Sequence, residues 1–322
     1  MNEKFELLEN DTKQLGEMVL RRIRATKSFE TTNNHLIESG QLGGYVQSED
    51  NLSQYGLSWV ADDACVCGKA RVEDDALVGD QALVSDYAIV RQNAIVYENA
   101  RLFGHAIIEG SAIAFQQCRI GGHFTISDNC MIYGKARIAG HGTGIIDSAV
   151  QIYDYASIFS AYHIKITGEV EIFEFAHITG GCKICDSVKI HGKACVVGND
   201  VRLEDHAEIC GEAQVFHSAY IGGQAYVSGT YPEDVTISGF SWICDDAQVM
   251  RKEDYRFACS GHYELTFFRN KEGHIIVAHL DERGLRETLL LDRFLTRNRK
   301  NKALVAEAHT AKLAMEVSNK KK

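Results

Sequence analysis

The chain has 322 residues, a formal net charge of −10, 45% hydrophobic residues and ten cysteines, which is enough apolar material for a substantial core in one or two domains. The acidic balance argues against sequence-independent nucleic-acid binding, because such binding depends on an excess of Lys and Arg. No apolar stretch approaches the roughly 18 residues of a membrane helix and the N-terminus lacks a signal-peptide pattern, so we expect a cytoplasmic protein with reduced cysteines that binds neither nucleic acid nor membranes.

Residues 1–58 predict a β-rich cap. Residues 4–30 read as two or three strands, and a glycine-bearing turn follows at residues 40–44. A repeat structure needs such a cap, because its terminal coil would otherwise expose strand edges and core to water.

Residues 59–250 contain a repeat with a period of six. An aliphatic residue recurs at every sixth position from Val60 to Ile138, interrupted only by Ala114, and a small residue usually follows four positions later, ending at Gly142. A helix does not return to one face every six residues, whereas short strands joined by corners do. Three such strands close a triangular coil of 18 residues, and shifted frames continue the pattern to Val249, giving about ten coils.

Residues 251–322 predict a β-hairpin followed by helix. Two apolar segments, residues 263–268 and 274–278, flank a loop that contains glycine, as in a hairpin with a longer turn. From about residue 285 Leu, Ala and charged residues predominate, which predicts one or two helices.

Nearly the whole chain resembles the YdcK-like proteins. The resemblance is carried by the hexads and by residues 22–25, 40–46, 51–53, 59–60 and 265–281. This enterobacterial and phage-associated family is placed in the trimeric LpxA-like acyltransferase superfamily. The resemblance implies a transferase activity and a single-stranded left-handed β-helix, although most parallel crossovers are right-handed. The predicted fold is thus all-β, with a left-handed parallel β-helix between an N-terminal β cap and a C-terminal hairpin with helices.

An aromatic column is predicted on one side of the coils. Its members each follow an inward aliphatic residue: Tyr97, Phe115, Tyr133, Tyr153 and Phe173. An outward stripe this apolar is seldom left in water. Three interpretations remain open: a homo-oligomer interface, cover by the C-terminal helices, or a platform for a carbohydrate-like ligand.

Two further columns predict a candidate site. At intervals of 18 residues stand three arginines and, at the following corner, three histidines: Arg101, Arg119 and Arg137, then His105, His123 and His141. Stacked cations repel unless an anion lies between them, so the arginines predict an anion groove, which the resemblance would make an acyl-donor groove. Alternatively, outward carboxylates neutralise the arginines, or the columns reflect only duplicated coils. The histidines are candidate general bases, and His141 is the best placed because a two-residue insertion bulges its loop.

Two functions are compatible with these columns. The first is an acyl- or acetyltransferase that uses acyl-CoA or an acyl carrier protein as donor and an amine or hydroxyl as acceptor, with no tightly bound cofactor. The second is a non-enzymatic β-helical scaffold or protein-binding module, such as a phage-associated one. No metal site is expected, because Cys182 points inward and Cys185 outward despite their metal-like spacing.

Overall fold

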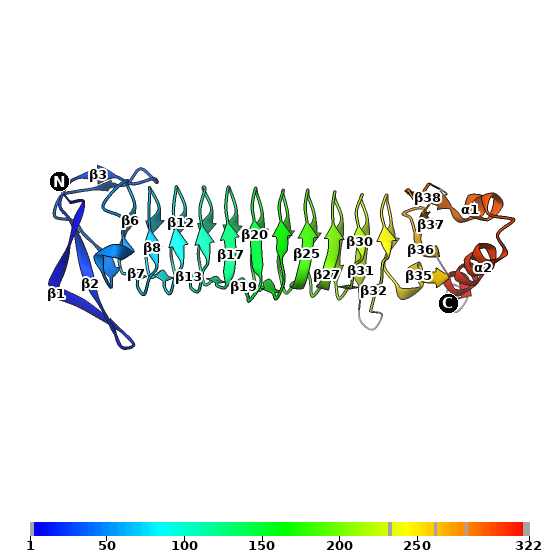
Figure 1. Ribbon diagram of the computed structural model, residues 1–322, viewed down its shortest axis with the longest axis horizontal. Helices are drawn as coiled ribbons and strands as arrows, with labels where there is room; N and C mark the ends of the chain where they lie inside the picture. Colours follow the sequence, from blue (N-terminus) through cyan, green and yellow to red (C-terminus); the bar gives the residue numbers. More distant parts are fainter. Residues whose placement is uncertain (1–2, 231–233, 261–262, 281–282, 318–322) are drawn as a thin grey trace. The chain divides into compact units, whose positions relative to one another are not determined.

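The computed structural model describes residues 3–230, 234–260, 263–280 and 283–317 (Figure 1). The chain divides into two compact units, Met1–Glu169 and Val170–Lys322. Both units are built on a left-handed parallel β-helix whose coils contribute short strands to three sides. Within the described residues, no helix combines the length and the apolar character needed to cross a membrane.

The N-terminal cap of the first unit is an antiparallel sheet that leads into the first coil. Its elements are β1 (Phe5–Leu15), β2 (Met18–Ala25), β3 (Phe29–Glu30), β4 (Leu36–Ile37), β5 (Leu42–Val46) and the 3₁₀ helix η1 (Glu49–Asn51). The antiparallel pairs are β1 with β2, β2 with β5, and β3 with β4. β5 then pairs in parallel with β7 (Cys65–Val66) of the first coil, so the cap satisfies the strand edge that this coil would otherwise expose.

The cap also buries two cysteines at outward strand positions. Cys65 and Cys67 flank the inward Val66, yet they are only 5% and 1% exposed, because Leu20 and Tyr45 of the cap pack over them. This burial raises the pKa of Cys67 to about 11. An outward position in the repeat is therefore not by itself a surface position.

The coils of the first unit have three sides, named here the arginine, middle and aromatic sides. The arginine side consists of β7, β10 (Leu83–Val84), β13 (Arg101–Leu102), β16 (Arg119–Ile120), β19 (Arg137–Gly140) and β22 (Ser157–Ser160). The middle side consists of β8 (Arg71–Val72), β11 (Ile89–Val90), β14 (Ile107–Ile108), β17 (His123–Ile126), β20 (Thr143–Ile146) and β23 (Ile164–Ile166). The aromatic side consists of β6 (Trp59–Val60), β9 (Leu77–Val78), β12 (Ile95–Val96), β15 (Ile113–Ala114), β18 (Met131–Ile132) and β21 (Gln151–Ile152). Each strand pairs in parallel with its equivalent in the next coil.

The inward side chains fill the coils as the repeat predicts. The aliphatic residues from Val60 to Ile138 are 0% exposed, and so is Ala114, which interrupts their column. The residues four positions later are equally buried as far as Ala136, including the alanines from Ala64 to Ala112. Alternation along each short strand places both sets inside, so the predicted core is confirmed.

The two-residue insertion that follows Ile138 lies before Thr143, whereas the repeat frame placed it after Gly142. Phe124 pairs in register with Gly144, not with Gly142. A Cβ atom on Gly144 would collide with the Phe124 ring, so the glycine leaves the space that this large inward side chain fills. The expected inward position of Gly142 is therefore wrong.

Acidic corner residues tie each coil to the next. Asp62 and Asp80 have φ values of 53° and 54°, in the left-handed region that Asp tolerates better than most residues. The carboxylate of Asp62 accepts the backbone N–H of Asp80 at 3.1 Å, and that of Asp80 accepts the N–H of Glu98 at 3.0 Å. Some of the acidic side chains of the protein therefore accept hydrogen bonds between coils.

The second unit contains coils of the same kind. One side consists of β24 (Glu171–Ile172), β26 (Lys189–Ile190), β28 (Glu208–Gly211), β31 (Tyr226–Gly229) and β34 (Gln248–Val249), each paired in parallel with the next. The other two sides consist of β25 (His177–Ile184) and β27 (Cys195–Leu203), which both run past a corner, and of β29 (Gln214–Phe216), β30 (Tyr220–Ile221), β32 (Thr236–Ile237) and β33 (Trp242–Ile243). The described strands amount to about eleven coils, against the ten expected.

The C-terminal part of the second unit is a four-stranded antiparallel sheet with two helices. Its elements are the 3₁₀ helix η2 (Lys252–Asp254), β35 (Tyr255–Ser260), β36 (Tyr263–Arg269), β37 (Ile275–Leu280), β38 (Arg286–Leu290), α1 (Leu291–Arg297) and α2 (Lys302–Val317). Phe294 of α1 and Ala308 and Ala311 of α2 are buried in one cluster with Phe267 and Val277 of the sheet. The predicted hairpin, β36 with β37, and the two predicted helices are confirmed, but residues 286–290, where helix was expected, form strand β38 beside β37.

The burial of the core predicts that the same substitution at two adjacent positions of one strand has very different effects on stability. Ile126 is 0% exposed, so we expect Ile126→Asp to bury an unpaired carboxylate and to lower the free energy of unfolding by about 4 kcal/mol or more. Thr125 points outward on the same strand, so Thr125→Asp should change this free energy by at most about 1 kcal/mol. Urea denaturation followed by circular dichroism measures both variants, and equal losses would contradict the assignment of inward and outward positions.

Candidate functional site

Three arginines form a cationic strip on the arginine side of the first unit. Arg101 pairs in register with Arg119 and Arg119 with Arg137, and all three side chains are exposed. In the described part of the chain, no carboxylate lies within 4.0 Å of their guanidinium groups. Stacked strands hold the three positions about 4.8 Å apart. The strip is therefore a local region of positive potential on an acidic protein. It lacks the neighbouring carboxylates that would neutralise the arginines.

Apolar side chains lie beside the strip. Phe103 follows Leu102 and is 37% exposed, and its ring covers Gly121 of the next coil, where a Cβ atom would collide with it. Phe159 stands in the same column three coils beyond Phe103 and is 44% exposed. This apolar column separates the arginines from the next corner.

His105 and His123 form a ring stack at that corner. Their ring centroids lie 4.5 Å apart with an interplanar angle of 9°. Tyr87 stacks on the other face of His105 at 4.7 Å, and the Lys69 ammonium lies 5.4 Å from the centre of the Tyr87 ring. The structure thus brings two of the three predicted histidines together.

His141 does not belong to this stack. Thr143, not His141, pairs in register with His123, and the Thr143 hydroxyl lies 3.0 Å from Nδ1 of His163. Because the insertion precedes residue 143, His141 lies on the bulge and meets the Phe159 ring edge-on at 6.5 Å. The expectation that spacing by 18 residues aligns His141 with the other two histidines is therefore wrong.

A cavity of about 500 Å³ opens next to His105. Its walls come from the segment around η1 and from the first coils: Ser48, Asp50, Asn51, Gly68, Lys69, Ala70, Arg71, Tyr87, Ile89 and His105. The Asn51 side chain fixes the η1 wall, because its amide donates to the backbone carbonyl of Ala70 at 2.8 Å. The sequence does not predict this cavity, since no repeat pattern indicates where η1 lies against the coils.

The aromatic column of the first unit is a ladder of parallel rings. Centroids lie 5.2 Å apart from Tyr97 to Phe115 and 4.9 Å apart at each of the next two steps, through Tyr133 to Tyr153. A second cavity, of about 490 Å³, is lined by Ile95, Tyr97 and Ile113 of this side and by Thr31, Asn33 and His35 near β3 and β4. The cap therefore partly covers one end of the ladder. In the second unit, the expected ladder residue Phe173 stacks on His191 at 4.7 Å.

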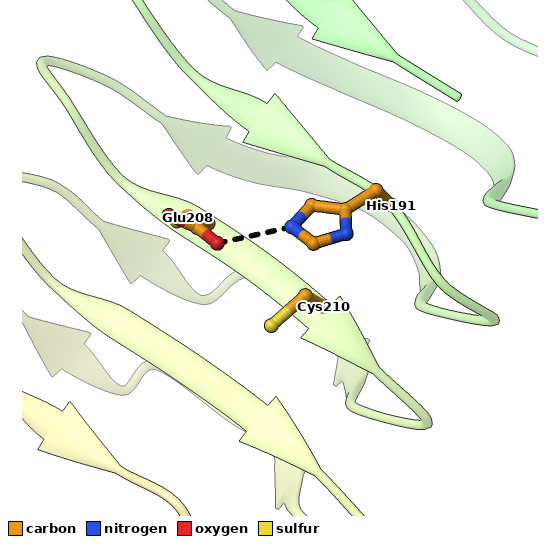
Figure 2. A group of neighbouring side chains, drawn as sticks. All are labelled: His191, Glu208 and Cys210. Atoms are coloured by element: carbon orange, nitrogen blue, oxygen red, sulfur yellow. Dashed lines mark hydrogen bonds and ion pairs between the residues drawn. The ribbon is translucent and has the colours of Figure 1, made fainter. Parts of the chain in front are cut away.

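One group among the described residues has the composition and spacing of a metal site: His191, Glu208 and Cys210 of the second unit (Figure 2). Cys182 and Cys185 do not form another. Cys182 is buried inside the coil, which raises its pKa to about 12, whereas the half-buried Cys185 donates to the Asp186 carboxylate outside it.

Neither the protein-family models nor the curated proteins contain a match to this sequence. The chemistry of the first unit therefore has to be inferred from its geometry. Guanidinium groups can bind phosphate oxygens in pairs, and an exposed imidazole can accept a proton near neutral pH. The arginine side offers both, separated by an apolar column.

The arginine strip predicts a salt-dependent effect on stability. Arg119 lies between two like charges, so Arg119→Gln should raise the free energy of unfolding by about 0.5 kcal/mol at low ionic strength. High salt should remove most of this gain by screening. Arg202 lies 3.4 Å from the Asp200 carboxylate, so Arg202→Gln should give no gain at either salt concentration. Urea denaturation at low and high salt measures both variants, and a loss of stability in Arg119→Gln would mean that the strip is neutralised.

Proposed function

We propose that the protein is a cytoplasmic, YdcK-like acyltransferase of the LpxA-like kind, which moves an acyl group from acyl-CoA or an acyl carrier protein to an amine or hydroxyl. The observation that carries the proposal is the order of columns on the arginine side, with cations first, exposed apolar side chains next and stacked imidazoles last. An acyl thioester donor presents its parts in the same order, as phosphates, a neutral linker and the thioester. The resemblance to an acyltransferase superfamily supports the same assignment.

Each column has a distinct role in this proposal. Arg101, Arg119 and Arg137 bind phosphate oxygens through their planar forks. Phe103 supports the neutral linker. His105 accepts the proton of the acceptor amine or hydroxyl as that group attacks the thioester carbon. The carbon–sulfur bond then breaks, and the leaving thiolate takes up a proton. His105 is preferred to His141 as the base because it lines the cavity of about 500 Å³.

The proposal includes a homo-oligomer that forms through the aromatic column. Tyr97, Phe115, Tyr133 and Tyr153 are only half-buried in the single chain, and flat stacked rings are well suited to contact with a second copy. Phe173 of the second unit is a further candidate contact with the second copy. The cytoplasmic location agrees with the cysteines, none of which forms a disulfide.

The second candidate function is a non-enzymatic scaffold or protein-binding module. The ladder favours it, because four parallel rings on one side offer a rigid apolar surface to any protein partner. In that case the arginine strip is a feature of the duplicated coils, and acyl-CoA does not bind.

Acyl-CoA binding tests the enzymatic proposal. We expect isothermal titration calorimetry to detect acetyl-CoA or a longer acyl-CoA, and Arg119→Ala to weaken binding about tenfold through loss of charge-assisted hydrogen bonds. Arg202→Ala, an exposed arginine outside the strip, should bind as the wild type does. His105→Ala should lower turnover about 100-fold with little change in affinity. Absence of binding of any acyl-CoA at millimolar concentration would reject the proposal in favour of the scaffold.

The solution mass tests the homo-oligomer. We expect the wild type to be larger than a monomer by light scattering, and the double variant Phe115→Lys, Tyr133→Lys to dissociate, since it would bury two ammonium groups in the interface. Replacing Tyr155, which is 51% exposed outside the ladder, with Lys serves as the matched control. A wild-type monomer would exclude the interface.

A further inference from the structure

A separate cluster of chemically reactive side chains lies on one side of the second unit. Glu208 and Cys210 are two residues apart on β28 and flank the buried Ile209, so both point away from the coil interior. His191 follows β26, which pairs in parallel with β28 through Lys189 with Glu208 and Ile190 with Ile209. His191 therefore lies opposite Cys210 on the neighbouring coil. Figure 2 shows the three side chains on the same face of these two coils.

The distances among the three groups are those of a cluster that can close on one ion. One ligand atom of each residue lies within 4.8 Å of the other two, and Nε2 of His191 is 3.0 Å from Oε1 of Glu208. An imidazole nitrogen, a carboxylate oxygen and a thiolate sulfur are all donors that zinc accepts. Three protein ligands leave a fourth tetrahedral position for water.

We propose that His191, Glu208 and Cys210 form a binding site for a divalent cation of the zinc class. The metal binds Nε2 of the neutral imidazole and one carboxylate oxygen. It displaces the proton of the Cys210 thiol, which passes to the solvent, and forms a metal–sulfur bond. The His191 and Glu208 side chains are 25% and 37% exposed, whereas Cys210 is 4% exposed. The ion therefore enters between the two exposed ligands and meets the sulfur at the base of the site.

The imidazole is held in place before any ion binds. The Phe173 ring stacks on it with an interplanar angle of 4°. On the side away from Glu208, Nδ1 lies 3.9 Å from Oε2 of Glu174, and the same oxygen accepts the backbone N–H of Gly192 at 2.7 Å. The distance from Nδ1 to Oε2 is too long for a hydrogen bond, so Glu174 acts on the ring through its charge. A negative charge on this side favours a proton on Nδ1, which leaves Nε2 free to bind the metal.

The sulfur also has a supporting contact. Sγ of Cys210 lies 3.2 Å from the hydroxyl oxygen of Tyr226 on the next coil. In the thiol form the sulfur donates to this hydroxyl. Once the metal has replaced the thiol proton, the hydroxyl can reverse its role and donate to the thiolate. The site thus has an outer partner for the nitrogen ligand and another for the sulfur ligand.

Cobalt(II) titration of the full-length protein tests the site. The protein is treated with a chelator, dialysed and titrated with Co²⁺, a spectroscopic substitute for zinc. We expect one Co²⁺ to bind per chain, with a thiolate-to-cobalt charge-transfer absorption in the near ultraviolet and tetrahedral d–d bands in the visible. Addition of Zn²⁺ should abolish both signals. A wild-type protein without the charge-transfer band would overturn the proposal.

Variants assign the signal to these residues. Cys210→Ser should abolish the charge-transfer band and weaken Co²⁺ binding, while Glu174→Gln should keep the band and weaken binding about tenfold. Cys195→Ser and His206→Asn, which alter a thiol and an imidazole elsewhere in the same unit, should match the wild type. A charge-transfer band that survives Cys210→Ser would show that the ion binds at another thiol.

Partly exposed ligands keep the test decisive if Cys210→Ser does not fold. Glu208→Gln and His191→Asn change side chains that reach solvent, so we expect both to retain the wild-type circular dichroism. Each should weaken Co²⁺ binding, and unchanged affinity in either variant would overturn the site. These measurements require no acyl-CoA and are therefore independent of the proposed acyl transfer.

Discussion

Backbone hydrogen bonding between consecutive coils is the constraint on which the rest of the structure depends. In each bond the acceptor lies on the coil that follows the donor. The amide of Cys65 donates to the carbonyl of Ala82 at 2.9 Å, and the amide of Arg101 donates to the carbonyl of Cys118 at 3.0 Å. A buried amide or carbonyl left without a partner costs about 1–3 kcal/mol. A strand therefore cannot slip against its neighbour without losing a whole row of bonds, and the register of the coils is fixed. This fixed register turns a spacing in the sequence into neighbouring side chains on the surface.

Columns concentrate one chemical property in a small area. Rings in register stack at 4.9 Å, as from Phe115 to Tyr133, and the stack is favourable. Guanidinium groups in register repel one another. The same geometry that stabilises the ladder therefore concentrates positive charge in the arginine strip. The group of His191, Glu208 and Cys210 follows the same principle, since adjacent columns of two coils supply all three ligand atoms.

Interruptions of the repeat give the molecule its individual sites. The insertion before Thr143 moves His141 out of the histidine stack and onto Phe159. The cap covers Cys65 and Cys67 with apolar side chains, and other parts of it, near β3 and β4 and around η1, form walls of two cavities. In the first unit, the cavities of about 490 and 500 Å³ lie where the cap meets the regular coils.

The sequence by itself determined which residues of the coils point inward, because a period of six has no other solution in a short-stranded fold. It could not place the insertion, since Gly142 and Gly144 are both small enough for an inward position. The volume of the Phe124 ring decided in favour of Gly144. The tertiary structure alone also decided the burial of Cys65 and the cavity beside His105, which depend on the position of the cap.

The cluster in the second unit was hidden for a related reason. Ile190 pairs with Ile209, a step of 19 residues and not 18, so a search at constant spacing misses the alignment of His191 with Cys210. One residue lies between Gly180 and Cys182, whereas two residues lie between the equivalent positions of the next coil, Gly198 and Val201. This extra residue shifts the register at that point. Spacing in the sequence fixes neighbours only while every coil has the same length, and hydrogen bonding between folded coils fixes them where it does not.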